Sequence, residues 1–199
     1  GAVVALAPSN VGWGGCCSAD ITVGYTLGGA DLPGAEVYQH PDATHETVVH
    51  GKAPASMRER FLAGMLSGEP AIRVEAIQAP IMLMAGDADP LWPAALAVEL
   101  LLQRLRANEF QQPIHAQIYQ GAGHSIGSAF PFWAMRSVGT ATPHPVDGVL
   151  MPKGGTPSAN AYAARDGANK ILEFYRTYLS VVSHYSPSSK SIRPLPDEP

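Results

Sequence analysis

The sequence predicts an α/β fold with a mostly parallel sheet flanked by helices. Two observations predict it. Residues 1–7 and 80–85 are short, uninterrupted apolar runs that end at turn residues, as do strands buried on both faces of a parallel sheet. Between 80 and 119 a strand, a helix and a second strand follow one another, which is the order of a crossover between parallel neighbours.

The N-terminal elements follow from composition and periodicity. Residues 1–7 are rich in Val and Ala and stop at Pro-Ser-Asn, so they predict a strand. Residues 11–53 are rich in Gly with little sustained periodicity, which indicates an irregular insertion with short strands or turns. Residues 54–64 predict a short helix. Its inward side is expected to consist of Met57, Phe61 and Leu62.

The middle of the chain carries the clearest pattern. The strand expected at 80–85 closes at Gly-Asp-Ala-Asp-Pro, and residues 94–107 form a helix by propensity and pattern. Pro93 before this helix and Asn108 after it are typical boundary residues. Residues 114–119 are expected to form the next strand, which leads into Gly-Ala-Gly-His.

The C-terminal part is expected to contain a second irregular insertion at 125–158 and a last helix at 159–179. The inward side of that helix is expected to consist of Tyr162, Ile171, Phe174 and Tyr178. From residue 183 the composition turns to Ser, Pro and charge, which offers too little apolar surface to offset the entropy of ordering. We therefore expect one domain over 1–182 and a disordered tail over 183–199.

Composition narrows the class of protein. The 199 residues are 46% hydrophobic, enough for a core, and their net charge of −4 argues against a nucleic-acid partner. No apolar run approaches the roughly 20 residues of a membrane span. Cys16 and Cys17 are adjacent, and neighbours rarely reach disulfide geometry, so the sequence indicates a reducing compartment. With no visible leader, a cytoplasmic protein is expected.

Two polar loops follow neighbouring strands of the predicted sheet. Asp89 comes after the strand at 80–85, and His124 comes after the strand at 114–119. Ligands of open α/β sheets bind beyond the carboxyl ends of the strands, so the two side chains are expected to meet there. A carboxylate that orients an imidazole, which takes a proton from a hydroxyl or thiol, is the acid–base part of a catalytic triad. Asp87 competes for the acid role, but Asp89 lies further into the loop and is favoured.

The order of these groups, acid before base, is that of the α/β-hydrolase fold, in which the nucleophile precedes both. The chain is therefore expected to be the C-terminal portion of such a fold, with the N-terminal strands and the nucleophile elbow missing. No elbow is recognised: Cys16 and Cys17 follow a strand in the wrong topological place, and Ser9 and Ser125 are similarly poor candidates. The nucleophile is expected upstream of Gly1.

Several segments resemble the acyl-CoA thioester hydrolase and bile acid-CoA:amino acid N-acyltransferase family. Residues 78–93 (QAPIMLMAGDADPLWP) are similar to its acid-bearing segment, and residues 119–124 (YQGAGH) to its histidine loop. The Gly-Gly-Thr-Pro at 154–157 and the helix after it resemble its last loop and helix. Residues 2–9, with the Trp-Gly-Gly at 13–15, resemble the strand that follows the nucleophile helix. The resemblance covers most of residues 1–180.

The resemblance implies a Ser or Cys nucleophile, Asp89 as orienting acid and His124 as general base. No cofactor is expected. The resemblance further implies an acyl-enzyme that forms from a fatty acyl-CoA or a similar thioester and is resolved by water or by an amine. The expected partners are this small-molecule substrate and the N-terminal half of the same hydrolase. The chain by itself is expected to be a poor catalyst, because loss of a triad nucleophile costs about 10⁶ in turnover.

Two alternatives stay open. A dienelactone hydrolase-like enzyme or a general carboxylesterase would share Asp89 and His124 but not the Gly-Gly-Thr-Pro loop. A non-catalytic remnant that binds acyl chains or a protein partner would lack an upstream nucleophile. Trp92, Phe130 and Trp133 are candidates for the wall of an acyl pocket, since such sites are largely apolar and aromatic. Phe130 and Trp133 fit a packed insertion equally well.

Two further groups of residues, three histidines and a pair of glycines, are expected to have structural roles. His40, His45 and His50 are five residues apart, which does not place them on one side of a helix, and no Cys supports them, so no metal site is expected. Gly154 and Gly155 fit an ordinary loop better than a phosphate cradle.

Overall fold

The centre of the fold is a small parallel sheet. The computed structural model describes residues 1–14, 25–35, 57–127, 140–143 and 150–179. Its three-stranded sheet has the order β1-β4-β5, and both neighbouring pairs run parallel. The strands are β1 (Val3–Leu6), β4 (Ile81–Gly86) and β5 (Ile114–Tyr119). The described residues therefore form an α/β structure built on a parallel sheet, as expected.

The three strands differ in burial because they differ in neighbours. Every residue of the central strand β4 is buried. Strand β1 is only half-buried along its length, and within the described residues it pairs with β4 alone. The expectation that residues 1–7 are buried on both faces is therefore too strong, since an edge strand lacks a second neighbour to cover it. The other edge strand, β5, exposes His115 and Ala116.

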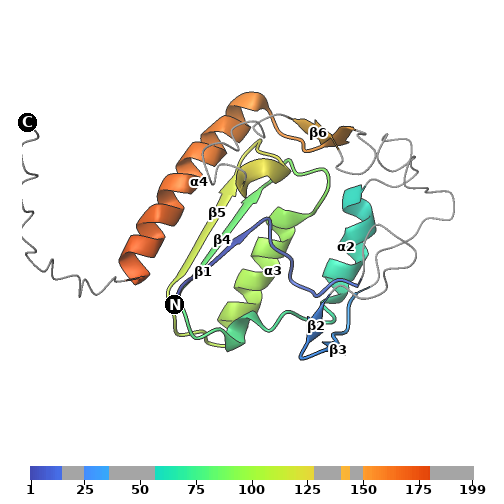
Figure 1. Cartoon of the computed structure of the whole chain (residues 1–199), viewed down its shortest axis with the longest axis vertical. Coiled ribbons are helices and arrows are strands. Elements are labelled where there is room, and N and C mark those ends of the chain that lie inside the picture. Colours follow the sequence, from blue (N-terminus) through green and yellow to red (C-terminus); the bar gives the residue numbers. More distant parts are fainter. Residues whose placement is uncertain (15–24, 36–56, 128–139, 144–149, 180–199) are drawn as a thin grey trace, which may run out of the picture.

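Two helices cover opposite faces of the sheet (Figure 1). Helix α3 (Ala94–Ala107) packs on the face presented by Ile81 and Leu83, and helix α4 (Pro157–Tyr178) on the face presented by Met82 and Met84. The alternation of side chains along β4 divides them between the two clusters. The bounds predicted for α3 and β5 are confirmed, with Pro93 and Asn108 flanking α3.

Helix α4 begins earlier than predicted, and one of the four side chains expected to face inward is exposed. Thr156 caps it, its hydroxyl accepting the Ala159 N–H at 3.1 Å, and Pro157 opens the first turn. The prediction that Tyr162 faces inward is wrong, since this side chain is 55% exposed. Ile171 and Phe174 are buried as expected, and Tyr178 is half-buried. The rest of the buried side is formed by Asn160, Ala163, Ala164 and Gly167. These residues are small, so the helix lies close to the sheet.

Helix α2 (Met57–Ser67) continues past the predicted end at Gly64. The predicted start at 54–56 and the Met57 side chain lie outside the description. Phe61 is buried as expected, Leu62 is half-buried, and Met65, which the prediction did not include, is almost fully buried. A Cβ at Gly64 would lie 2.6 Å from Cζ3 of Trp13, so the glycine lets the indole pack directly against the helix.

The two stretches predicted to be irregular contain short elements. The first includes the hairpin β2 (Thr26–Leu27) and β3 (Ala30–Asp31). The second includes the hairpin β6 (Ala141–Pro143) and β7 (Leu150–Pro152). Two 3₁₀ turns complete the described elements: η1 (Val74–Ala76) and η2 (His124–Gly127). The tail predicted at 183–199 lies outside the description. In the part that is described, no helix combines the length and apolarity needed to cross a membrane.

Candidate active site

The loops that follow β4 and β5 meet at one end of the sheet. Gly86, the last residue of β4, is in register with Tyr119, the last residue of β5. The Asp87 N–H donates to the Tyr119 carbonyl at 3.2 Å, and the Ala88 N–H donates to the Ala122 carbonyl at 2.9 Å. Because parallel strands end at the same edge, these backbone bonds hold the two loops together side by side.

Asp89 and His124 are in direct contact at this edge. Oδ2 of Asp89 lies 2.7 Å from Nδ1 of His124. The Asp89 side chain is 1% exposed, whereas that of His124 is 31% exposed. An ionised carboxylate only accepts hydrogen bonds, so in the neutral imidazole this contact places the proton on Nδ1 and leaves Nε2 as an acceptor. The buried carboxylate therefore fixes both the orientation and the tautomer of a partly exposed imidazole.

The second carboxylate oxygen of Asp89 is held by backbone. Oδ1 accepts the Leu91 N–H at 2.9 Å and the Trp92 N–H at 3.0 Å. The backbone carbonyl of Asp89 accepts the Arg58 guanidinium at 3.1 Å, which ties the loop to α2. With both carboxylate oxygens engaged, the side chain cannot rotate away from His124 without losing charge-assisted bonds.

Asp87 has a different partner. Its side chain is exposed, and Oδ1 accepts the Gly121 N–H at 2.6 Å. It therefore braces the backbone of the histidine loop, and it is Asp89 that touches the imidazole.

A third segment secures the histidine loop. The His124 N–H donates to the Lys153 carbonyl at 2.7 Å. Asn160, on the buried side of α4, accepts the Gly123 N–H on Oδ1 at 2.8 Å and donates from Nδ2 to the Gly154 carbonyl at 3.0 Å. Sequence reasoning missed Asn160. The available signal was a polar side chain on the buried side of an amphipathic helix, since buried amides need specific partners.

The two glycines at 154 and 155 have a backbone role. Their φ angles are +70° and +72°. A Cβ at Gly154 would lie 2.3 Å from the Ala88 carbonyl oxygen, and one at Gly155 would lie 2.3 Å from Oδ1 of Asn160. The loop interior is thus filled by the protein itself, which supports the ordinary-loop interpretation over a phosphate cradle.

Lys153 brings a cation to this region. Burial lowers the pKa of its amine, and the neighbouring Asp89 carboxylate acts against this by raising it. The charge therefore lies in a partly dehydrated position close to the acid of the pair.

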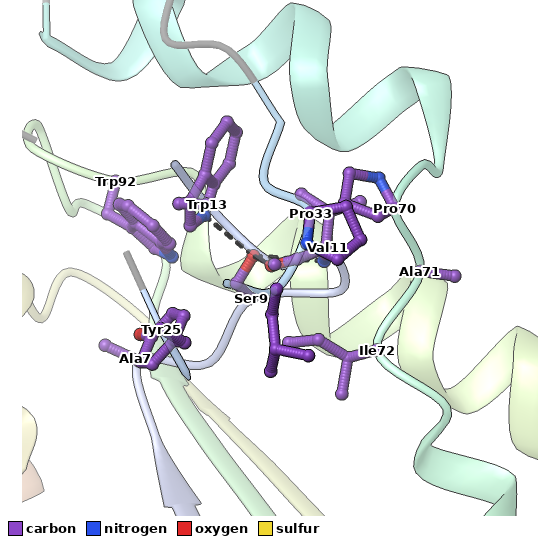
Figure 2. Close-up of a pocket in the computed structure, with 12 residues that line it drawn as sticks. Ala7, Ser9, Val11, Trp13, Tyr25, Pro33, Pro70, Ala71, Ile72 and Trp92 are labelled. Carbon is purple, nitrogen blue, oxygen red and sulfur yellow. Dashed lines mark hydrogen bonds between the residues drawn. The ribbon is translucent and has the colours of Figure 1, made fainter. Parts of the chain in front are cut away.

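Trp92 connects the acid loop to an aromatic cluster. Its indole Nε1 donates to the Pro8 carbonyl at 2.8 Å. Its ring centroid is 5.5 Å from that of Trp13 and 4.6 Å from that of Phe61. Trp92 and Trp13 also line a cavity of about 520 Å³ (Figure 2). Phe130 and Trp133, the other candidates for an apolar wall, lie outside the described residues.

The nucleophile candidates need one correction. The interpretation of the sequence overlooked a Gly-x-Ser-x-Gly spacing, which occurs at 123–127 and centres on Ser125. In a nucleophile elbow a strand turns sharply and directly into a helix. Here a loop separates β5 from the single 3₁₀ turn η2, which contains Ser125 and follows His124 immediately. The Ser125 side chain lies outside the description.

The other nucleophile candidates are Ser9, Cys16 and Cys17. The Ser9 hydroxyl donates to the Val11 carbonyl at 2.8 Å and accepts the Trp13 Nε1–H at 3.0 Å, so its bonds are local. Cys16, Cys17 and the three histidines at 40, 45 and 50 lie outside the description. Among the residues that are described, no three His, Cys, Asp or Glu side chains gather as a metal site would require.

A parallel sheet with a carboxylate and a histidine at the ends of adjacent strands is the arrangement of an α/β-hydrolase-type domain. Residues 37–181 match the family model described as BAAT / Acyl-CoA thioester hydrolase C terminal. The chain belongs to this family, which comprises acyl-CoA thioester hydrolases and acyltransferases. No curated protein matches the chain.

Proposed function

We propose that this chain supplies the acid and the base of a thioester hydrolase or acyltransferase, with Asp89 as orienting acid and His124 as general base. The observation that carries the proposal is the 2.7 Å contact between the buried Asp89 carboxylate and Nδ1 of the partly exposed imidazole. Family membership supports thioesters as the substrate class. In this scheme neither a metal nor an organic cofactor takes part.

In the proposed reaction Nε2 of His124 accepts the proton of a Ser or Cys nucleophile as the nucleophile attacks the thioester carbonyl. The imidazolium is stabilised by Asp89, which stays ionised. The tetrahedral intermediate then collapses, the carbon–sulfur bond breaks, and the departing thiolate takes the proton from Nε2. Water or an amine attacks the acyl-enzyme in the second half, and His124 accepts and returns a proton in the same way.

We propose further that the nucleophile belongs to a segment outside this sequence, on a strand that pairs with the edge of β1 opposite β4. Two observations support this. Within the described residues β1 pairs with β4 alone, which leaves its other backbone edge open to a parallel neighbour. Ser125 stands in a 3₁₀ turn beside His124, where no strand-to-helix elbow is present.

The test uses the longest polypeptide that the coding sequence specifies around these residues. Release of the free thiol from palmitoyl-CoA is followed for wild type, His124→Gln and His115→Gln. His115 is the matched control, since it is exposed near the start of β5, at the opposite end of the strand from the histidine loop. Its Nε2 contacts the Tyr178 hydroxyl at 3.0 Å. We expect loss of about 10⁴–10⁶ in turnover for His124→Gln and near wild-type rates for the control.

Four outcomes would contradict parts of the proposal. Retained thioesterase activity in His124→Gln would remove the base assignment. Loss of activity in Ser125→Ala with folding intact would place the nucleophile inside this chain. Faster cleavage of a p-nitrophenyl ester than of the thioester would favour the general carboxylesterase, and palmitoyl-CoA binding without turnover would favour the non-catalytic remnant.

A further inference from the structure

A cavity of about 520 Å³ lies beside the acid loop (Figure 2). Its size falls within the roughly 300–1,000 Å³ typical of small-molecule sites. In Figure 2 the indoles of Trp13 and Trp92 lie on one side, with Pro70 and Ile72 on the other. The cavity is therefore bounded by the segment after β1, by the stretch after α2 and by the loop that contains the acid.

The lining has the character of a hydrocarbon site. Among the described residues that line it, no side chain carries a charge. The polar side-chain groups of Ser9, Trp13 and Trp92 are already engaged. The Trp13 Nε1–H donates to Ser9 Oγ at 3.0 Å, and the Trp92 Nε1–H donates to the Pro8 carbonyl at 2.8 Å. A ligand that buried a charge here would find no charged partner among these residues, which is costly. The part of a ligand that enters must therefore be uncharged and apolar.

The rim of the cavity exposes apolar side chains to water. Tyr25 is 63% exposed, Leu32 is 42% exposed and Ile72 is 41% exposed, and all three line the cavity. Clustered exposed apolar surface beside a concavity is typical of a binding site, because covering it releases water. The rim thus points to the same class of ligand as the interior.

Trp92 couples this cavity to the acid–base pair. Its indole forms part of the cavity wall, while its backbone N–H donates to Oδ1 of Asp89 at 3.0 Å. The indole is held in place by the Pro8 carbonyl and by contacts with Trp13 and Phe61. A ligand that contacts the Trp92 indole therefore touches the residue whose backbone N–H helps to hold the Asp89 carboxylate.

We propose that this cavity binds the uncharged hydrocarbon chain of the substrate and that Ile72, at its rim, helps to determine which chain lengths are accepted. The assignment of that chain to a reacting substrate rests on the proposed function. The binding itself does not, because every residue that carries it belongs to this chain.

The binding arm of the test uses the 199-residue chain and a series of primary alcohols from hexanol to dodecanol. Trp133→Phe is introduced so that Trp13 and Trp92 are the reporting indoles, and tryptophan fluorescence is titrated. We expect saturable binding whose Kd falls about fourfold for each added methylene, the equivalent of about 0.8 kcal/mol, until the cavity is filled. Non-saturable titrations, or a Kd independent of chain length, would overturn the proposal.

A matched pair of variants locates the site. Ile72→Glu places a carboxylate at the rim and is expected to weaken dodecanol binding at least tenfold. Leu66→Glu changes another exposed apolar residue, 62% exposed on α2 and outside the cavity lining, and is expected to leave Kd unchanged. Urea unfolding of both variants checks folding. Equal weakening by the two variants would place the binding elsewhere on the surface.

The catalytic arm separates this proposal from the proposed function. In the active polypeptide, Ile72→Glu is expected to raise KM for palmitoyl-CoA with little change for acetyl-CoA. Turnover without alcohol binding would overturn the cavity assignment and leave the acid–base pair standing. Alcohol binding by a polypeptide that cleaves no thioester or ester would overturn the proposed function but would still support the hydrocarbon site.

Discussion

Asp87 and Asp89 stand two residues apart in one loop and have opposite environments. The carboxylate of Asp87 is exposed and accepts the Gly121 N–H at 2.6 Å. That of Asp89 is 1% exposed and contacts Nδ1 of His124 at 2.7 Å. One carboxylate therefore braces the backbone of the histidine loop, and the other fixes the imidazole itself. Two closely spaced acids divide the tasks of holding the loop and orienting the ring.

Asp89→Asn is expected to reduce turnover by about 10⁴, because an amide in this position stabilises the wrong imidazole tautomer and cannot stabilise the imidazolium. Asp87→Asn is the control, since its amide oxygen can still accept the Gly121 N–H. Steady-state thioester hydrolysis by the active polypeptide measures both. Similar losses in the two variants would mean that loop integrity, and not the charge next to the ring, determines the rate.

Gly154→Ala is expected to disrupt the junction between the acid loop and the last loop. Its φ of +70° costs an L-residue roughly 1–2 kcal/mol, and the added Cβ would lie 2.3 Å from the Ala88 carbonyl oxygen, which adds about 1–3 kcal/mol of overpacking. Gly28→Ala has a comparable φ of +59° with nothing within 4 Å of the Cβ, so it carries the backbone cost alone. Urea unfolding compares them, and equal losses of stability would show that the close approach is unimportant.

The ion pair between Glu75 and Arg104 predicts a pH-dependent stability. Its bidentate bonds of 2.5 Å and 2.6 Å join η1 to α3, and the Arg104 hydrogen bonds lower the Glu75 pKa from 4.5 to about 2. A depressed carboxyl pKa in the folded state contributes stability above pH 4.5 that is lost as pH falls toward 2. Because both side chains are partly exposed, the contribution is limited to about 1 kcal/mol.

Glu75→Gln is therefore expected to be less stable than wild type at pH 6 and to approach it between pH 4.5 and 2. Thermal unfolding followed by circular dichroism at several pH values measures the difference. A gap between the two proteins that stays constant across this range would show that the pair contributes through packing alone.

Lys153→Met is expected to raise the melting temperature at pH 7. The pKa of Lys153 is lowered, with burial outweighing the attraction of Asp89, so the charged amine is disfavoured in the folded state at neutral pH. That penalty lessens as pH rises through the lowered pKa toward the ordinary 10.5, so the advantage of Met should shrink between pH 7 and 10. A Met variant that is less stable at pH 7 would show that the attraction to Asp89 dominates.

Some elements were predictable because their causes are local. The bounds of α3 were predicted correctly, since a run of strong helix formers between Pro93 and Asn108 leaves little choice of ends. The end of helix α2 was placed too early because Gly64 resembles a helix end in the sequence. In the structure it is a helical residue that makes room for Trp13. Tyr162 was assigned to the wrong side of α4 because the inward side there consists of small residues, which carry a weak hydrophobic pattern.

The sequence by itself determined the buried central strand, the helix and strand after it, and the two loops that contain Asp89 and His124. Apolar runs, helix formers and turn residues act over short distances in the chain, so their consequences are visible in the order of residues. Only the tertiary structure decided that Asp89 contacts His124, that Asn160 secures the histidine loop, and that Trp13 and Trp92 share a cavity. Those relationships depend on the approach of segments far apart in the chain, and close packing sets that approach to within the length of a hydrogen bond.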